Sequence, residues 1–154
     1  MRFAIVEPDM PANLGACLRL AAGFGLALDV VGPCGFPLDH ARIKRAAMDY
    51  ADLAELRRWT DFDAFRAAER GGRIILLTTK GDVRFDRLEI DAGDSLVFGS
   101  ESRGAPDAVH AAADIRARLP LKPPARSFNL ATAAAMALTL AFDRADMMDR
   151  LDQA

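Results

Sequence analysis

The chain alternates short, continuous apolar runs with longer segments in which apolar residues recur at helical spacing. Five apolar runs are predicted to be buried strands, at residues 2–6, 26–32, 73–79, 95–100 and 114–121. Helices are predicted between them, at residues 13–23, 39–48, 61–70, 105–113 and 127–150. Strands that are apolar throughout and alternate with helices are typical of an α/β domain with a mostly parallel sheet.

Polar residues and prolines mark the predicted helix ends. Asn13, Asp39, Thr60 and Ser127 are the predicted N-caps, and Pro106 suits the first turn of its helix. Residues 53–59 fit either a helix or a strand. The last helix carries Met136, Leu138, Leu140 and Phe142 among alanines, and this stripe fits either the core or an association surface.

Length and composition limit the domain organisation and the location. A chain of 154 residues, 51% hydrophobic and 27% charged, predicts one globular domain over residues 1–154. No apolar run approaches the roughly 20 residues that span a bilayer, and the N-terminus lacks the pattern of a signal peptide. We therefore expect no membrane contact and a cytoplasmic location. The net charge of −2 means that any nucleic-acid site must be a local patch.

The sequence lacks several common catalytic and cofactor-binding patterns. His40 and His110 have no metal-ligand companions at the usual spacing, so neither a metal site nor a Ser-His-Asp triad is expected. Cys17 and Cys34 lie in separate apolar contexts, which predicts reduced thiols. Neither a G-x-G-x-x-G motif after the first strand nor a phosphate-binding P-loop motif is present.

Three predicted strands end in loops rich in glycine, proline and small polar residues. Their sequences are "EPDMPANLG", "FGSESRGAP" and "LPLKPPARSFN", and "TTKGD" follows a further strand. Parallel α/β sheets bind ligands beyond the carboxyl ends of their strands. The loops therefore predict a ligand site built largely from backbone.

Three segments resemble the signature motifs of the SPOUT-class RNA 2′-O-ribose methyltransferases. They are "NLGACLRLAAGFG", "LVFGSESRGAP" and "LPLKPPARSFNLATAAAMAL", and their order and spacing cover nearly the whole chain. The short length, "RAAMDY" and "LTTKG" resemble the subfamily that acts on nucleotide 34 of tRNA. The resemblance implies a homodimer with a deep C-terminal trefoil knot. It also implies 2′-O-methylation of the wobble ribose, at cytidine or modified uridine 34, with S-adenosylmethionine as methyl donor.

The resemblance also implies roles for individual residues. The family's cofactor contacts fall on Leu77, Gly99, Leu119 and Ser127, with backbone help from Arg103, Gly104 and Leu121. Its substrate and catalytic positions fall on Asn13, Arg19, Glu101, Ser127 and Asn129.

The residues themselves leave some of these roles open. Arg19 fits either a stabiliser of developing alkoxide charge or a base assisted by an RNA phosphate, and on a bare helix it would be a solvated arginine. Glu101 and Arg103 would otherwise form a surface ion pair. Asn13 and Ser127 fit simple caps.

The RNA-binding prediction rests on a local basic set, Arg42, Lys44 and Arg45. The alternative for this set is a solvated helix face. Two alternative functions also stay open: methylation of another tRNA position, and a SPOUT-like RNA-binding module without catalysis.

Overall fold

The protein is a three-layer α/β structure around one parallel sheet. The computed structural model describes residues 1–38, 50, 53, 55–68 and 71–152. Within these residues, seven parallel strands lie in the order β3-β2-β1-β6-β4-β7-β5. They are β1 (Arg2–Val6), β2 (Leu28–Val31), β3 (Leu56–Trp59), β4 (Ile74–Leu77), β5 (Val83–Arg84), β6 (Ser95–Phe98) and β7 (Ile115–Arg118). The predicted parallel α/β architecture is confirmed.

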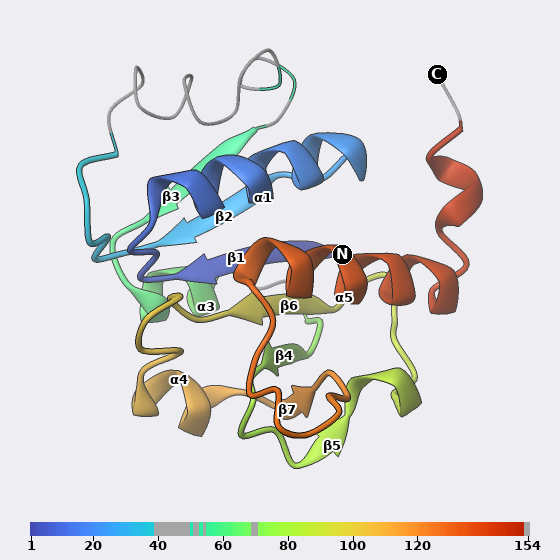
Figure 1. Ribbon diagram of the computed structural model, residues 1–154. Helices are drawn as coiled ribbons and strands as arrows, with labels where there is room; N and C mark the ends of the chain where they lie inside the picture. Colours follow the sequence, from blue (N-terminus) through green and yellow to red (C-terminus); the bar gives the residue numbers. More distant parts are fainter. Residues whose placement is uncertain (39–49, 51–52, 54, 69–70, 153–154) are drawn as a thin grey trace.

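Helices cover both faces of the sheet (Figure 1). Helices α1 (Pro11–Gly23) and α5 (Leu130–Arg144) lie together on one face. Helices α3 (Phe62–Ala67) and α4 (Asp107–Ala112) cover the other. Two short 3-10 turns, η2 (Phe85–Arg87) and η3 (Met148–Arg150), complete the described elements. None of the described helices has the length and apolar character needed to cross a bilayer.

The central strands β1, β2, β4 and β6 are largely apolar because both of their faces are buried, whereas β3 and β7 carry exposed arginines. In β1, Phe3 and Ile5 face the core beneath α1 and α5, whereas Ala4 and Val6 face the core beneath α3 and α4. All four side chains are at most 1% exposed. Burying one large apolar side chain contributes about 1.5–3 kcal/mol, so burial on both faces stabilises the strand substantially.

The alanines of α5 allow this helix to pack closely against its neighbours. Ala134, Ala137 and Ala141 are 0% exposed in the core shared with α1. From the predicted stripe, Leu138 and Phe142 are buried, and the Phe142 ring packs on Phe24 with centroids 4.8 Å apart. Half of the stripe therefore belongs to the core, while Met136 and Leu140 remain partly exposed.

Three predicted N-caps are wrong. Helix α1 begins two residues earlier than predicted, because Pro11 occupies its first turn and needs no N–H partner there; its N-cap is Met10. Asp61 rather than Thr60 caps α3, by accepting from the Ala64 N–H at 2.8 Å. The cap of α5 is likewise displaced from Ser127, by two residues, to Asn129.

Other boundaries also differ from the prediction. Residues 56–59 form a strand, β3, and the Trp59 indole donates to buried Asp29 at 2.6 Å. Strand β7 ends at Arg118, so the predicted strand residues 119–121 belong to a loop. Helix α5 ends at Arg144 instead of 150, where Asp146 turns the chain with a φ of +52°. Strand β5 was not predicted, because two residues leave no periodicity. The predicted helix at 39–48 lies outside the described residues.

Candidate functional site

A cavity of about 550 Å³ opens at the carboxyl ends of β4, β6 and β7. The strands end at one level, since Leu77 pairs with both Phe98 and Ala117 in the sheet register. Loops 78–81, 99–105 and 119–129 rise from these ends and form most of the walls. The volume is that of a typical small-molecule or cofactor site.

The cavity brings together most of the residues predicted from the sequence. Every residue predicted to contact the cofactor lines it, as do three of the predicted catalytic residues. They are Leu77, Gly99, Arg103, Gly104, Leu119, Leu121 and Ser127, and Asn13, Glu101 and Asn129. Residues from both ends of the chain therefore share one site, as the loop pattern predicted.

A tight turn after β6 supplies backbone to the cavity wall. The backbones of Ser100 and Gly104 exchange two hydrogen bonds of 3.1 and 3.0 Å, and Gly104 has a φ of +75° that favours glycine. At Gly99 a Cβ atom would lie 2.1 Å from the Ala105 nitrogen. Two glycines are thus required for this turn to fold back beside the cavity.

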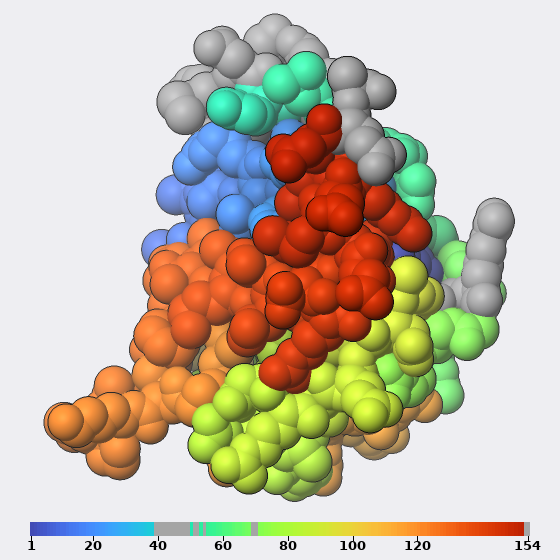
Figure 2. Space-filling model, turned by 90° about the vertical axis from the view of Figure 1, so that its right-hand side faces the viewer, coloured from blue at the N-terminus to red at the C-terminus, as the bar shows by residue number. Residues whose placement is uncertain are grey.

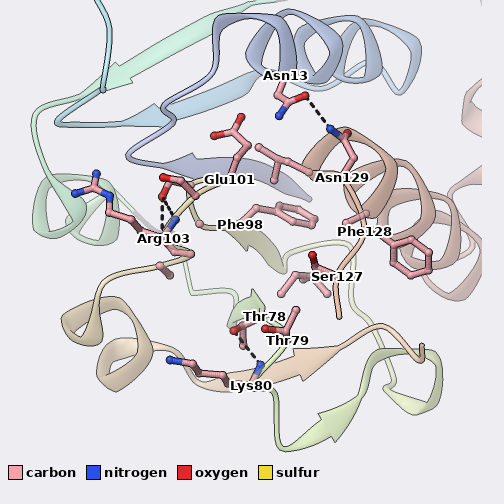
Figure 3. A pocket seen from close by; sticks show the side chains of 18 of the residues that line it. Asn13, Thr78, Thr79, Lys80, Phe98, Glu101, Arg103, Ser127, Phe128 and Asn129 are labelled. Carbon is pink, nitrogen blue, oxygen red and sulfur yellow. Dashed lines mark hydrogen bonds between the residues drawn. The ribbon is translucent and has the colours of Figure 1, made fainter. Parts of the chain in front are cut away.

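Asn13 and Asn129 join the two helices at one side of the cavity (Figure 3). The Asn129 amide donates to the Asn13 Oδ1 at 3.0 Å, and its own Oδ1 accepts from the N–H groups of Ala131 and Thr132. Asn13 is 9% exposed. Asn129 therefore both caps α5 and holds the Asn13 amide. The sequence had instead predicted Asn13 as the N-cap of the first helix.

Asp9 and Glu101 form a carboxyl pair next to these amides. The Asp9 N–H donates to the Glu101 Oε2 at 3.1 Å, and Ser102 donates to the Asp9 Oδ2 through both its N–H and its hydroxyl. Burial, and then the neighbouring Asp9, raise the pKa of Glu101. Hydrogen bonds from Glu101 and Ser102 lower the pKa of Asp9. Glu101 is therefore the member of the pair that holds a proton more readily.

The alternative ion pair between Glu101 and Arg103 is absent. Arg103 lies 3.5 Å from Glu7 instead, and its side chain is 68% exposed. An exposed pair of this length contributes little stability. Glu101 thus faces Asp9 and the cavity, and no arginine in the described part of the chain forms an ion pair with it.

Arg19 does not line the cavity. It follows Asn13 by six helical residues, which places it about 9 Å further along α1 and about 240° around it. The two side chains therefore leave the helix in different directions, and Arg19 is half-buried. Within one chain, the structure separates Arg19 from the other predicted catalytic residues. The basic set Arg42, Lys44 and Arg45 lies outside the described residues.

Sequence reasoning missed several residues of the site. His110, which was not predicted as a site residue, is partly buried on α4 and lines the cavity. Thr78, Thr79 and Lys80 lie opposite the Asn13 side of the cavity (Figure 3). Their segment, "TTKGD", already marked a loop after a strand. Asp9 had only its place in the "EPDMPANLG" loop as a signal.

Among the described residues, no group of three or more His, Cys, Asp or Glu side chains is placed to hold a metal ion. Cys17 is buried and Cys34 is partly buried, and neither forms a disulfide. Burial raises the pKa of the Cys17 thiol to about 12, which keeps it protonated at neutral pH.

Replacing Asn129 separates its two contributions. Asn129→Asp retains the oxygens that cap α5 but cannot donate to Asn13, so we expect near wild-type stability and about a tenfold loss of activity. Asn129→Ala removes both contacts, and the lost cap costs about 0.5–2 kcal/mol. Thermal unfolding and activity assays of both variants check this. Equal stability loss in the two variants would show that the cap does not depend on the Asn129 oxygen.

The fold and the site define an α/β protein with a cofactor-sized, loop-built cavity at the carboxyl ends of its strands. The chain belongs to the SpoU rRNA methylase family, whose profile matches residues 1–139. It is 45% identical over 138 residues to a tRNA (cytidine(34)-2′-O)-methyltransferase of Beijerinckia indica, covering 88% of this chain and 86% of that one. The resemblance to RNA 2′-O-methyltransferases is confirmed.

Two solved structures share the fold. One, described as giving insights into 2-OH methylation of C/U34 on tRNA, has a TM-score of 0.87 and 35% identity, over 93% of this chain and 94% of that one. The other is an AdoMet-bound rRNA methyltransferase from Sinorhizobium meliloti, with a TM-score of 0.82 and 26% identity. That match covers 92% of this chain and 55% of the other.

Proposed function

We propose that the protein transfers a methyl group from S-adenosylmethionine to the ribose 2′-hydroxyl of nucleotide 34 of tRNA. One observation carries this function: the cavity joins a backbone-lined pocket to the amide and carboxyl groups of Asn13, Asn129 and Glu101. The C/U34 specificity of the relatives supports the choice of substrate.

The residues present fit the cofactor. The adenosine part of S-adenosylmethionine needs a cavity whose backbone can approach it closely. At Gly99 the wall is so tight that it leaves no room for a Cβ atom. Leu77, Leu119 and Ser127 would hold the adenosine beside the turn at residues 100–104. When bound, S-adenosylmethionine supplies an electrophilic sulfonium methyl, so the protein must mainly orient the acceptor.

In the proposed mechanism, the polar side of the cavity positions the ribose. The hydrogen bond between Asn13 and Asn129 holds both amide groups in one orientation. In this orientation the amides bind the ribose that carries the 2′-hydroxyl. Correct alignment of two reactants supplies several kcal/mol of the barrier reduction. Glu101, protonated more readily than an ordinary carboxyl group, donates or accepts a hydrogen bond beside the acceptor.

Arg19 acts from a second copy of the chain in this proposal. It does not line the cavity of its own chain, as Asn13 does, whereas a homodimer built on α1 and α5 would bring the partner's α1 to the cavity rim. There the guanidinium would stabilise charge on the alkoxide, or accept its proton after an RNA phosphate shifts the arginine proton.

The function is tested by incubating the protein with S-adenosylmethionine and an unmodified tRNA transcript and mapping 2′-O-methyl groups by mass spectrometry. We expect one methyl group at nucleotide 34, and at least a tenfold lower rate for Arg19→Ala. Methylation at a different nucleotide would replace the proposed substrate. No methylation by the wild type would exclude the enzyme and leave an RNA-binding module.

Subunit complementation tests the dimer. Neither Arg19→Ala nor Glu101→Gln should be fully active alone. Random mixing of the two would place an intact cavity beside an intact Arg19 in one site of each heterodimer, and activity should recover to roughly a quarter of wild type. No recovery would remove the shared site.

Three wider features belong to the same proposal. The chain forms one methyltransferase domain, works in the cytoplasm where tRNA is modified, and carries a C-terminal trefoil knot. The path of residues 119–129 supports the knot, since it leads from β7 across the ends of β4 and β6 to α5 beside α1 (Figure 1).

A further inference from the structure

The loop at residues 122–126 stands out from the surface beside the cavity. All five of its residues are exposed, while Leu121 and Ser127 at its ends line the cavity. The segment forms the orange projection in Figure 2. Its sequence, Lys-Pro-Pro-Ala-Arg, contains two cations and no side chain suited to a core.

The two cations of this loop form no ion pair with any residue that the structure describes. Among the described residues, no carboxylate lies within ion-pair distance of Lys122 or Arg126. The neighbouring arginines differ: Arg84 pairs with Asp86 at 2.6 Å and Arg116 with Asp82 at 2.5 Å. Lys122 and Arg126 therefore present uncompensated positive charge to whatever approaches the cavity.

The loop holds these charges in a limited set of positions. Pro123 and Pro124 each fix one backbone torsion, and the Ala125 N–H donates to the Lys122 carbonyl at 3.1 Å, which closes a turn. Less conformational entropy is lost when a stiff loop binds than when a flexible one does. Such a loop is therefore suited to binding a ligand without rearrangement.

The charge of the molecule is unevenly distributed around this loop. Lys80 and Arg103 line the same cavity, so two further basic side chains lie near the loop. The overall net charge is nevertheless −2, and residues 143–152, at the far end of α5, contain four aspartates and two arginines. A polyanion would thus be attracted to the end of the molecule that carries the cavity.

We propose that the 122–126 loop binds the phosphate backbone of the RNA substrate next to the nucleotide whose ribose enters the cavity. This rests on the proposed function, because it takes the substrate to be RNA. Lys122 and Arg126 contact two phosphates, and these contacts hold the RNA in register without reading its bases. The loop is distinct from the basic set at residues 42–45.

The test is the salt dependence of tRNA binding. Lys122→Ala/Arg126→Ala removes two cations from the loop. The matched control, Arg87→Ala/Arg150→Ala, removes two exposed cations near the C-terminal end of α5, where Arg144 binds the carbonyls of Phe85 and Leu88. Kd for an unmodified tRNA transcript is measured between 50 and 200 mM salt, and Kd for S-adenosylmethionine is measured in parallel.

For the loop variant we expect the slope of log Kd against log salt to fall by about 1.4, since each single-strand phosphate contact contributes about 0.7. The control should keep the wild-type slope, and both should bind S-adenosylmethionine normally. An unchanged slope in the loop variant would overturn the proposal. So would a weaker affinity of that variant for S-adenosylmethionine that accounts for its weaker tRNA binding. Methyl mapping with wild-type protein tests the enzymatic function separately, so failure of one is distinguishable from failure of the other.

Discussion

Gly99→Ala is expected to abolish cofactor binding and to reduce kcat/KM by about 100-fold or more. The new Cβ atom would lie 2.1 Å from the Ala105 nitrogen and 2.3 Å from the Gly104 carbonyl carbon. Both are backbone atoms at the end of the turn, in Gly104 and Ala105, so no side-chain rotation can relieve the overlap. The turn must move by about 1 Å, and a displacement of that size in a reacting site costs about two orders of magnitude.

Calorimetric titration with S-adenosylmethionine and a methylation assay check this result. We also expect a loss of about 1–3 kcal/mol in stability from the overpacked turn. Gly23→Ala is the matched control, because a Cβ atom at the last residue of α1 would meet nothing within 4 Å. Wild-type cofactor affinity in Gly99→Ala would show that the turn does not form the cofactor wall.

Glu101→Gln is expected to lower activity by about 10- to 100-fold while raising stability at neutral pH. The amide has nearly the shape of the carboxyl group. Its oxygen can accept from the Asp9 N–H, and its NH₂ group can donate to the Asp9 carboxylate, whose Oδ1 is buried and has no hydrogen-bond partner among the described residues. The substitution thus removes a partly buried charge and adds a donor where one is missing.

The pH dependence of this gain follows from the direction of the pKa shift. The pKa of Glu101 is raised above its ordinary 4.5, so ionising this group disfavours the folded state. That cost grows as pH rises through 4.5 and is complete above the raised pKa. The stabilisation by Glu101→Gln should therefore be largest near pH 7 and should shrink below about pH 4.5.

Thermal unfolding at pH 7 and pH 4 measures this difference. A gain of about 1 kcal/mol corresponds to about 2–4 °C in Tm for a protein of this size. Glu89→Gln, at an exposed carboxylate outside the cavity, should leave Tm unchanged. A Tm for Glu101→Gln below that of the wild type at pH 7 would mean that the ionised pair stabilises the fold.

Asp9 itself behaves in the opposite sense. Its pKa is lowered, so its contribution to stability is present above the ordinary value of 3.8 and is lost as pH falls through the lowered value. In Glu101→Gln, the NH₂ group of the glutamine can still donate a hydrogen bond to Asp9, as the Glu101 side chain does when it lowers the pKa of Asp9. The gain at neutral pH therefore does not depend on a change in the charge of Asp9.

Hydrophobic patterning predicted the sheet well and the helix ends poorly. Within the runs at residues 2–6 and 73–79, residues 3–6 and 74–77 are buried on both faces of the sheet, and that condition leaves a continuous apolar signal. Caps are decided by one hydrogen bond, and Thr60 and Asp61 are neighbours that both qualify. At Asn13 the competing tertiary bond to Asn129 comes from a residue 116 positions away, which no local pattern contains.

The loops that form the site through their backbone could be predicted from the sequence, whereas the directions of the side chains could not. Glycines and prolines mark loops such as the one around Gly99, and parallel topology brings those loops to one edge. Arg19 lies near Asn13 in sequence, yet the helical rotation between them separates their side chains. The pairing of Asp9 with Glu101 requires two loops to meet, which follows from the order of β1 and β6 in the sheet.

That strand order also fixes when the protein can become functional during its synthesis. Strand β6 lies between β1 and β4, although both are made before it. A nascent chain that ends before residue 95 therefore exposes two unsatisfied strand edges to the ribosome exit region and to chaperones. The core on which α5 packs includes Leu96 and Phe98 of β6, and the non-local strand pairing that completes this core is slow. Translation pauses between residues 94 and 130 would consequently lengthen the period in which the chain is vulnerable to aggregation.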